Sequence, residues 1–351
     1  MMWPYFILII IPGIISGINY LNKKKIRRVL PLLVFFTILI SLLCLRNYSV
    51  GVDINNYIFI FNREGVKKWK DFTFIDDEIL YALLNKFSYL ISKDFRLLLV
   101  IIALMTTIPI YKIYKTDSDN LFLIIIIFVN MPNFVLLFSG LRQAIAISLG
   151  CLAFLLIKRR RIFLSVLVVL TAMLFHVSAF VLFLLYPLYF IKIRKTHLLL
   201  LIPLFFVTFI YNKQILIFFI SLLPDKYQNY TLTYSGAYST IFLFCSFLVF
   251  SFIVMDSEKA DKDSLFFRNV LLLSAFIQLF APWHPLAMRF NYYFIIFIPL
   301  AISRTIKYSK VQFRSIANLA KIIMIGFFVL YYFYYAYTGA DILNVYPYYF
   351  L

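Results

Sequence analysis

Long apolar segments recur along the whole chain and alternate with short clusters of lysine and arginine. Of the 351 residues, 64% are hydrophobic, whereas a soluble domain is about half apolar. One membrane-crossing helix uses about 20 such residues, so the chain has enough for about twelve crossings, within a range of about ten to thirteen. We therefore predict an all-α, polytopic integral membrane protein in which residues 1–351 form a single domain. A soluble enzyme, a disulfide-rich secreted domain and a disordered chain are excluded.

Apolar runs that end at charged, proline or polar turn residues predict the individual helices, because a helix in lipid satisfies its own backbone polar groups. The predicted helices cover residues 3–20, 29–45, 95–111, 121–138, 143–157, 162–175, 177–191, 198–211, 239–255, 265–281, 290–304 and 319–338. The stretch 162–191 is short for two crossings and predicts either two tilted helices or a re-entrant pair. No cleavage site of small residues follows the first helix, so we expect this helix to be retained.

The net charge of +19 comes from basic clusters that lie between the apolar segments. Such clusters fix orientation and meet anionic headgroups, so we expect membrane lipid as the partner and no nucleic acid. If the twelve predicted helices all cross and the N-terminus lies outside, every major cluster falls in the cytoplasm. These clusters lie at 23–28, 158–161, 192–195 and 304–314.

The opposite face then receives two long external loops, about 46–94 and 212–238. Within the first, residues 79–90 place apolar and polar side chains at helical spacing, which predicts a helix that lies along the membrane surface. A second interfacial helix is expected at 215–223, where Pro224 ends it.

Ionisable groups within apolar segments are costly and indicate a functional site. Arg142, followed by Gln143, begins a predicted helix at the outer face. A guanidinium there either binds a diphosphate or snorkels from a helix end. His176 lies within largely apolar sequence, where its imidazole binds a sugar or phosphate, acts as a base, or pairs with a neighbouring helix.

The run 281–290 predicts a tight outer turn that carries an aromatic ring, an imidazole and a guanidinium, on Trp283, His284 and Arg289. Trp283 either stacks on a sugar ring or belongs to an interfacial aromatic belt. His284 likewise either contacts the substrate or only forms part of this interfacial turn. Arg289 opens an aromatic helix that includes Tyr293, and its charge is suited to oppose a phosphate.

A further polar run follows the second predicted helix and contains Arg46, Gly51, Asp53 and Tyr57. The Asp53 carboxylate caps the following helix, neutralises a buried arginine, or serves as general base. Glu78, after Asp76 and Asp77, stands at the start of the surface helix, whose positive end favours acidic residues. The three cysteines show no ligand spacing, so we expect no metal and no cofactor.

Several short motifs, taken in their order along the chain, resemble those of the EpsG family of Wzy-type bacterial polysaccharide polymerases. The matching positions are Arg46 with Gly51-Val52-Asp53 and Tyr57, then Glu78, Leu141-Arg142-Gln143-Ala144, Phe175-His176-Val177-Ser178, Arg289-Phe290 with Tyr292-Tyr293, and Tyr346-Pro347-Tyr348. The resemblance spans nearly the whole chain. It departs from the family at Asp76-Asp77-Glu78-Ile79, where a Glu-Pro pair is more common.

The resemblance implies a GT-C-like membrane glycosyltransferase that polymerises undecaprenyl-diphosphate-linked repeat units into O-antigen, capsule or exopolysaccharide. It would act at the outer, periplasmic face of the bacterial cytoplasmic membrane, alongside a flippase and a chain-length regulator. With no metal, arginines must stabilise the leaving diphosphate, and we expect Arg142 and Arg289 to do so, followed by Arg46. Either His176 or Asp53 would accept the hydroxyl proton, while Gln143, Glu78, Trp283, His284, Tyr293 and Tyr57 would bind substrate. The alternative is a transporter or flippase of lipid-linked glycans, since charge along a pathway suits it equally.

Overall fold

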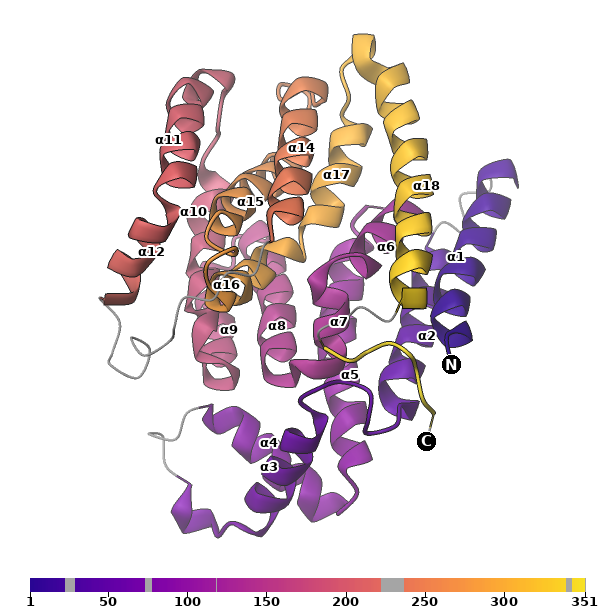
Figure 1. Ribbon diagram of the computed structural model, residues 1–351, viewed down its shortest axis with the longest axis vertical. Coiled ribbons are helices and arrows are strands. Elements are labelled where there is room, and N and C mark those ends of the chain that lie inside the picture. Colours follow the sequence, from indigo (N-terminus) through magenta and orange to yellow (C-terminus); the bar gives the residue numbers. More distant parts are fainter. Residues whose placement is uncertain (23–28, 73–77, 118, 222–236, 339–342, 351) are drawn as a thin grey trace. The chain divides into compact units, whose positions relative to one another are not determined.

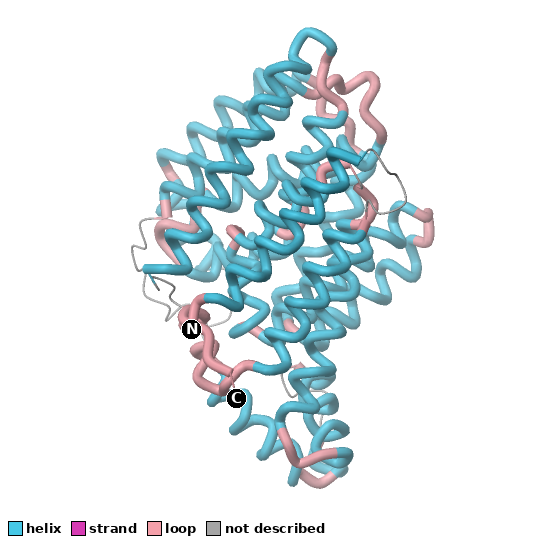
Figure 2. The backbone as a smooth tube through the Cα atoms, turned by 90° about the vertical axis from the view of Figure 1, so that its right-hand side faces the viewer, coloured by secondary structure: helices cyan, strands magenta, loops and turns pink. Residues whose placement is uncertain are grey.

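The computed structural model describes residues 1–22, 29–72, 78–117, 119–221, 237–338 and 343–350. Every regular element within these ranges is a helix, as Figure 1 and Figure 2 show, and the only bridges there are two isolated ones. The prediction of an all-α fold is therefore confirmed. Contacts divide the chain into unit 1, Met1–Phe183 with Asn318–Leu351, and unit 2, Leu184–Ala317. The prediction of a single membrane domain stays a prediction.

Unit 1 holds the N-terminal helices and most of the last one. Its helices are α1 (Trp3–Asn22), α2 (Leu30–Leu45), α3 (Ile54–Val66), η2 (Trp69–Asp71), α4 (Ile79–Ile91), α5 (Phe95–Tyr114), α6 (Leu121–Val129), α7 (Pro132–Ser139), α8 (Leu141–Lys158), α9 (Ile162–Phe175), η3 (Val177–Leu184) and α18 (Arg314–Thr338). Helices α5 and α8 pack together, and so do α8 and α9.

Unit 2 is helical throughout its described part. Its helices are α10 (Leu185–Phe190), η4 (Lys195–His197), α11 (Leu198–Ile210), α12 (Asn212–Ser221), α14 (Tyr238–Val254), α15 (Lys262–Gln278), α16 (Pro285–Ile295), α17 (Ile298–Lys307) and η5 (Val311–Phe313). Helix α12 begins three residues before the interfacial helix predicted at 215–223.

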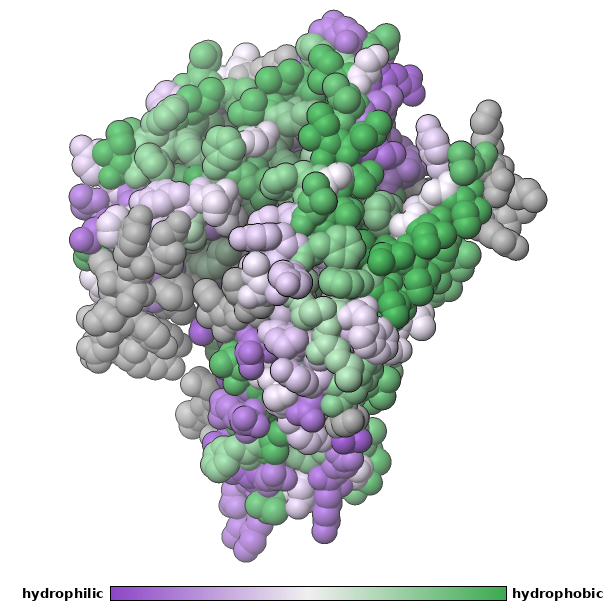
Figure 3. Space-filling model, turned by 45° about the vertical axis from the view of Figure 1, so that its right-hand side comes forward, coloured by the Kyte–Doolittle hydropathy of each residue, from purple (hydrophilic) through white to green (hydrophobic). Residues whose placement is uncertain are grey.

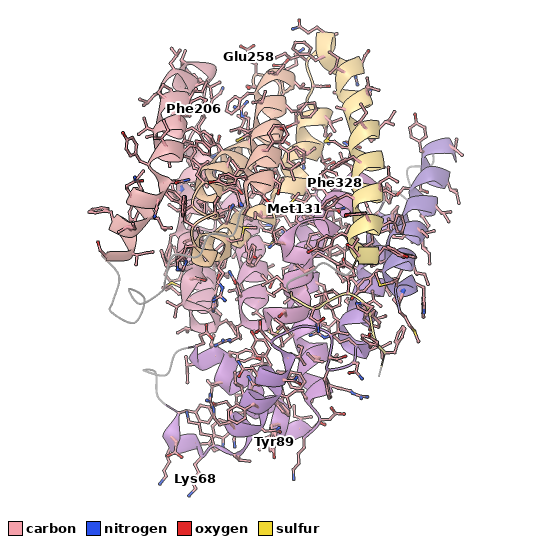
Figure 4. The ribbon with its side chains drawn as sticks, in the orientation of Figure 1. Lys68, Tyr89, Met131, Phe206, Glu258 and Phe328 are labelled. Atoms are coloured by element: carbon pink, nitrogen blue, oxygen red, sulfur yellow. The ribbon has the colours of Figure 1, made fainter. Side chains whose placement is uncertain are left out.

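Each of the twelve predicted segments contains a helix, and two of them are broken where one helix was expected: 121–138 and 290–304. The segment 177–191 begins as the 3₁₀ helix η3 and continues directly into α10. The first break has a local cause. Met131 is extended and precedes Pro132, which disfavours helical geometry at the preceding residue. Helices α6 and α7 consequently meet at an angle of 61°. The side chain of Asn130, in the break, donates to the carbonyl of Phe328 on α18 at 3.0 Å, and Figure 4 shows the neighbouring Met131 beside Phe328.

Four helices in the described ranges are long and apolar enough to cross a membrane, and six if each of two bent pairs is one span. Five shorter apolar helices accompany them, so the count of twelve crossings stays a prediction. The first helix presents Ile10, Ile14 and Ile18 outward with exposures of 46%, 57% and 51%. The hydrophobic colour over α1 in Figure 3 shows the same apolar face, which suits contact with lipid.

The long segment predicted as an external loop folds into a helical pair, α3 and α4, at one end of α5 (Figure 1). Helix α4 matches the helix predicted at 79–90. Phe61 and Tyr81 from this pair are buried with Phe95 and Leu98 of α5 and Leu141 of α8. This shared core fixes the α3–α4 pair against the helix ends that carry the polar residues. The outer end of the pair is hydrophilic (Figure 3).

Candidate functional site

Three polar side chains from three separate helix ends meet in unit 1. Glu78 immediately precedes α4, Arg142 is the second residue of α8, and His176 follows α9. The Glu78 carboxylate accepts a hydrogen bond from Arg142 Nη1 on Oε2 and one from His176 Nδ1 on Oε1. The side chains of Glu78, His176 and Arg142 are 8%, 22% and 33% exposed. We call these three residues the Glu78 cluster.

The backbone presents Glu78 and His176 in unusual local geometry. Glu78 has φ 66° and ψ 47°, a left-handed conformation that costs a non-glycine residue about 1–2 kcal/mol. Its two charge-assisted hydrogen bonds offset that cost. His176 is extended between α9 and η3; its N–H donates to the Ala172 carbonyl at 2.9 Å and its carbonyl accepts from Ala179 at 2.9 Å. The imidazole is therefore held at a fixed break in the helix.

Two tyrosines form the wall behind Arg142. Its guanidinium carbon lies 5.8 Å from the ring centre of Tyr57 and 5.9 Å from that of Tyr81, within the range of cation–π contacts. Burial raises the pKa of Tyr57, against the opposing effect of the Arg142 charge. Tyr57 therefore remains a neutral hydrogen-bonding group at neutral pH. The sequence predicted Tyr57 at the site but did not single out Tyr81, which lies within the helix predicted at 79–90.

The polar run after α2 packs against the end of α7. Arg46 is 1% exposed, and its Nη1 donates to the Phe138 carbonyl at 2.5 Å. Burial lowers the Arg46 pKa to about 10. Asp53 stands at the N-cap position of α3 without a side-chain capping bond; instead its carboxylate accepts from the Ser139 hydroxyl at 3.0 Å. Arg46 thus holds the chain just before Arg142 through the Phe138 carbonyl, and Asp53 holds it through Ser139, which the sequence did not single out.

Gly51 makes this packing possible. Its φ of 102° is unfavourable for residues with a side chain, and a Cβ atom there would lie 2.4 Å from the Phe138 carbonyl oxygen. The Gly-Val-Asp motif thus contains a glycine for close backbone approach and a carboxylate for Ser139.

The C-terminal tail lies along this same run. Backbone N–H groups of Asn47, Gly51 and Val52 donate to the carbonyls of Tyr349, Asn344 and Leu343 at 2.8–2.9 Å. The hydroxyl of Tyr348 donates to the Leu42 carbonyl at 2.8 Å. The Tyr346-Pro347-Tyr348 motif therefore belongs to a strap that supports the turn between α2 and α3.

Four of the predicted site residues belong to unit 2, namely Trp283, His284, Arg289 and Tyr293. Trp283 is half-buried and its indole N–H donates to Asn212 Oδ1 at 2.8 Å, with Lys213 Nζ 5.1 Å from its ring centre. His284 and Tyr293 are buried, whereas Arg289 is exposed. Burial, aided by the charge of Arg289, lowers the pKa of His284.

The structure thus brings Glu78, Arg142, His176 and Tyr57 together, and Arg46 and Asp53 beside the same helix end. Gln143 follows Arg142 on α8 and is buried. The meeting of Arg142 with Arg289 stays a prediction, since Arg289 belongs to the other unit. Asp76, Asp77 and the basic cluster at 23–28 lie outside the described residues.

The Glu78 cluster has the parts of a general base and of an anion-binding site. With Nδ1 engaged by a carboxylate, the neutral imidazole carries its second nitrogen, Nε2, as a proton acceptor. The adjacent guanidinium keeps a partly exposed surface that suits phosphate oxygens. Within the described ranges, no group of three His, Cys, Asp or Glu side chains is arranged to hold a metal ion.

Comparison with known proteins gives one family. No curated protein and no solved structure matches the chain. The EpsG family matches residues 29–350, nearly the whole length, including every residue of the Glu78 cluster and of the run after α2. The chain therefore belongs to the EpsG family and is a membrane protein of polysaccharide biosynthesis.

Proposed function

We propose that this protein polymerises lipid-linked oligosaccharide repeat units, with the Glu78 cluster as its catalytic centre. The observation that carries the proposal is the position of Glu78 between Arg142 and His176. A hydroxyl nucleophile needs a proton acceptor, and a diphosphate leaving group needs a preorganised cation. Family membership supports polysaccharide as the product class.

In this proposal Glu78 is a positioning residue, where the sequence had predicted a substrate ligand. Its carboxylate accepts the Nδ1 hydrogen of His176 and so directs Nε2 of the imidazole towards the substrate. The negative charge also stabilises the imidazolium that forms when Nε2 takes a proton. The ion pair with Arg142 sets the orientation of the guanidinium.

The reaction is a single displacement at the anomeric carbon of the donor. The acceptor sugar hydroxyl loses its proton to His176 Nε2 while its oxygen forms the new glycosidic bond. The bond between the anomeric carbon and the diphosphate oxygen breaks, and undecaprenyl diphosphate leaves with the electron pair. Arg142 meets the developing charge, with Arg289 as the second cation. A one-step displacement inverts the anomeric configuration.

The membrane arrangement belongs to the same proposal. We place the Glu78 cluster at the outer, periplasmic end of α8 and the basic residues 158–161 at its cytoplasmic end, as the positive-inside rule favours. About twelve crossings and a GT-C-like arrangement then put the lipid diphosphate at the outer headgroup level of the bacterial inner membrane. The α3–α4 pair would lie over the site, where it contributes Glu78 and Tyr57.

The test is polymerisation by the purified full-length protein in liposomes that contain a lipid-linked repeat unit from a strain lacking this gene. A ladder of products spaced by one repeat unit supports the proposal. If His176→Asn and Arg142→Ala lose this ladder but unfold thermally as the wild type does, the Glu78 cluster is the catalytic centre. Transport of a non-polymerisable repeat unit across the bilayer without any ladder would overturn the proposal in favour of a flippase.

A further inference from the structure

A hollow in unit 1 lies at the end of α8 opposite Arg142. Residues of α2, of the end of α5 and of the end of α8 line this hollow of about 610 Å³. This volume is within the range of about 300–1,000 Å³ typical of small-ligand sites. None of the residues proposed for catalysis lines it.

The position of the hollow follows from how α5 and α8 run. Leu98 and Leu141 share one buried cluster near the start of both helices, and the Ser148 hydroxyl donates to the Met105 carbonyl at 3.1 Å further along. The hollow then lies between residues near 111 on α5 and 155 on α8. The two helices are therefore parallel. Helix α8 has 18 residues, about 27 Å at 1.5 Å per residue, so its two ends reach opposite faces of a hydrocarbon core of about 30 Å.

The chemistry of the hollow changes along its length. Its walls are mostly apolar, and they include Leu33, which is 50% exposed. Three exposed cations, Lys112, Lys115 and Arg159, line the end where α5 and α8 finish. An apolar hollow that ends in three positive charges is complementary to a molecule with an acyl chain and an anionic head.

We propose that this hollow binds an anionic phospholipid, with phosphatidylglycerol as the representative, in the membrane leaflet opposite the Glu78 cluster. The head phosphate contacts Lys112, Lys115 and Arg159, and an acyl chain lies between α2 and α5. Basic pockets between membrane helices bind anionic headgroups in this way, and each lysine or arginine near the surface strengthens the attraction. The polyprenyl substrate is a poorer occupant, because its diphosphate reacts about one bilayer thickness away.

The experiment measures lipid binding to the purified, delipidated full-length protein by native mass spectrometry. Phosphatidylglycerol, phosphatidylcholine and undecaprenyl phosphate are titrated separately and in competition. We expect one phosphatidylglycerol to bind at concentrations where phosphatidylcholine does not. The triple variant Lys112→Gln, Lys115→Gln, Arg159→Gln weakens this binding at least tenfold. The matched control Lys158→Gln, Arg160→Gln, Arg161→Gln removes the same number of charges from residues around the end of α8 that do not line the hollow, and changes the binding less than threefold.

A steric variant separates the hollow from general surface charge. Thr37 lies on the α2 wall and is exposed, so Thr37→Trp fills the hollow without altering a charge or a buried side chain. It should weaken phosphatidylglycerol binding as strongly as the charge variant does. Equal losses in both charge triples, or unchanged binding in Thr37→Trp, would overturn the proposal. Displacement of phosphatidylglycerol by an equimolar amount of undecaprenyl phosphate would also overturn it, since the hollow would then belong to the substrate lipid. None of these readouts depends on polymerisation.

Discussion

Glu78 and His176 lie 98 residues apart in the sequence, and the Glu78 carboxylate accepts a hydrogen bond from the imidazole Nδ1. The same carboxylate is ion-paired with Arg142. One buried acid therefore connects the end of α9, the start of α4 and the start of α8. Because this acid fixes both a potential base and a potential anion-binding cation, the consequences of removing it are the most direct test of the site.

Glu78→Gln should lower polymerisation about 100-fold or more, because general base catalysis contributes about 10²–10⁴-fold and the imidazolium loses its counter-charge. The amide keeps the size of the side chain, so protein folding should be retained. The measurement is the initial rate of ladder formation from lipid-linked repeat units.

The matched control for Glu78→Gln is Glu64→Gln. Glu64 is 3% exposed and is also ion-paired with an arginine, Arg63, yet it lies on α3 outside the Glu78 cluster. Its loss should affect the rate less than threefold. Equal loss of activity in both variants would mean that Glu78 acts only through stability.

His176→Asn distinguishes the roles of the two ring nitrogens of His176. The asparagine amide can donate to Glu78 as Nδ1 does, but it has no group in place of Nε2. We expect thermal unfolding within about 0.5 kcal/mol of wild type, together with polymerisation reduced at least 100-fold. Activity retained in His176→Asn would exclude the imidazole as the base and leave Asp53 as the candidate.

Gly51→Ala should destabilise the protein by about 2 kcal/mol or more, because a Cβ atom at φ 102° is strained and meets the Phe138 carbonyl oxygen. The measurement is thermal unfolding in detergent. Gly17→Ala and Gly326→Ala are the controls: both glycines are helical, and an added Cβ meets nothing within 4 Å. Those two changes should be neutral or stabilising by up to about 1 kcal/mol. Similar behaviour of all three variants would contradict the packing role of Gly51.

Helix positions could be predicted from the sequence because lipid imposes one strong rule on apolar segments. The same rule does not show where a helix breaks. Pro132 indicated the bend between α6 and α7 only once Met131 was seen to be extended. The helical pair α3 and α4 was predicted only in its second half. Helix α3 buries Ile54, Tyr57 and Phe61, but its continuous apolar run covers only residues 57–61, between polar residues.

The candidate site could be predicted as a set of residue types but not as a set of pairs. Arg142 and His176 stood out because charge is rare in apolar sequence. That Glu78 joins them depends on three helix ends that meet only in the folded chain. Arg46 shows the opposite case. It looked like a phosphate ligand, yet the structure buries it against the Phe138 carbonyl, and its role in substrate binding stays a prediction.

His284 should make the stability of the protein depend on pH. Its folded pKa lies below the ordinary value of 6.5, chiefly because of burial and then because of Arg289. Between these two pKa values the unfolded chain binds more protons than the folded chain, so stability is constant above about 6.5 and falls as the pH decreases through this window. Each pKa unit between the folded and the unfolded value contributes about 1.4 kcal/mol to the free energy of unfolding.

Thermal unfolding of wild type and His284→Gln at pH 7.5 and 5.5 measures the effect. The contributions of the other two histidines cancel in the comparison. We expect wild type to lose more stability than the variant on acidification, and Arg289→Gln to reduce the wild-type loss. An identical decrease in wild type and His284→Gln would show that His284 is protonated in the folded protein as readily as in the unfolded chain.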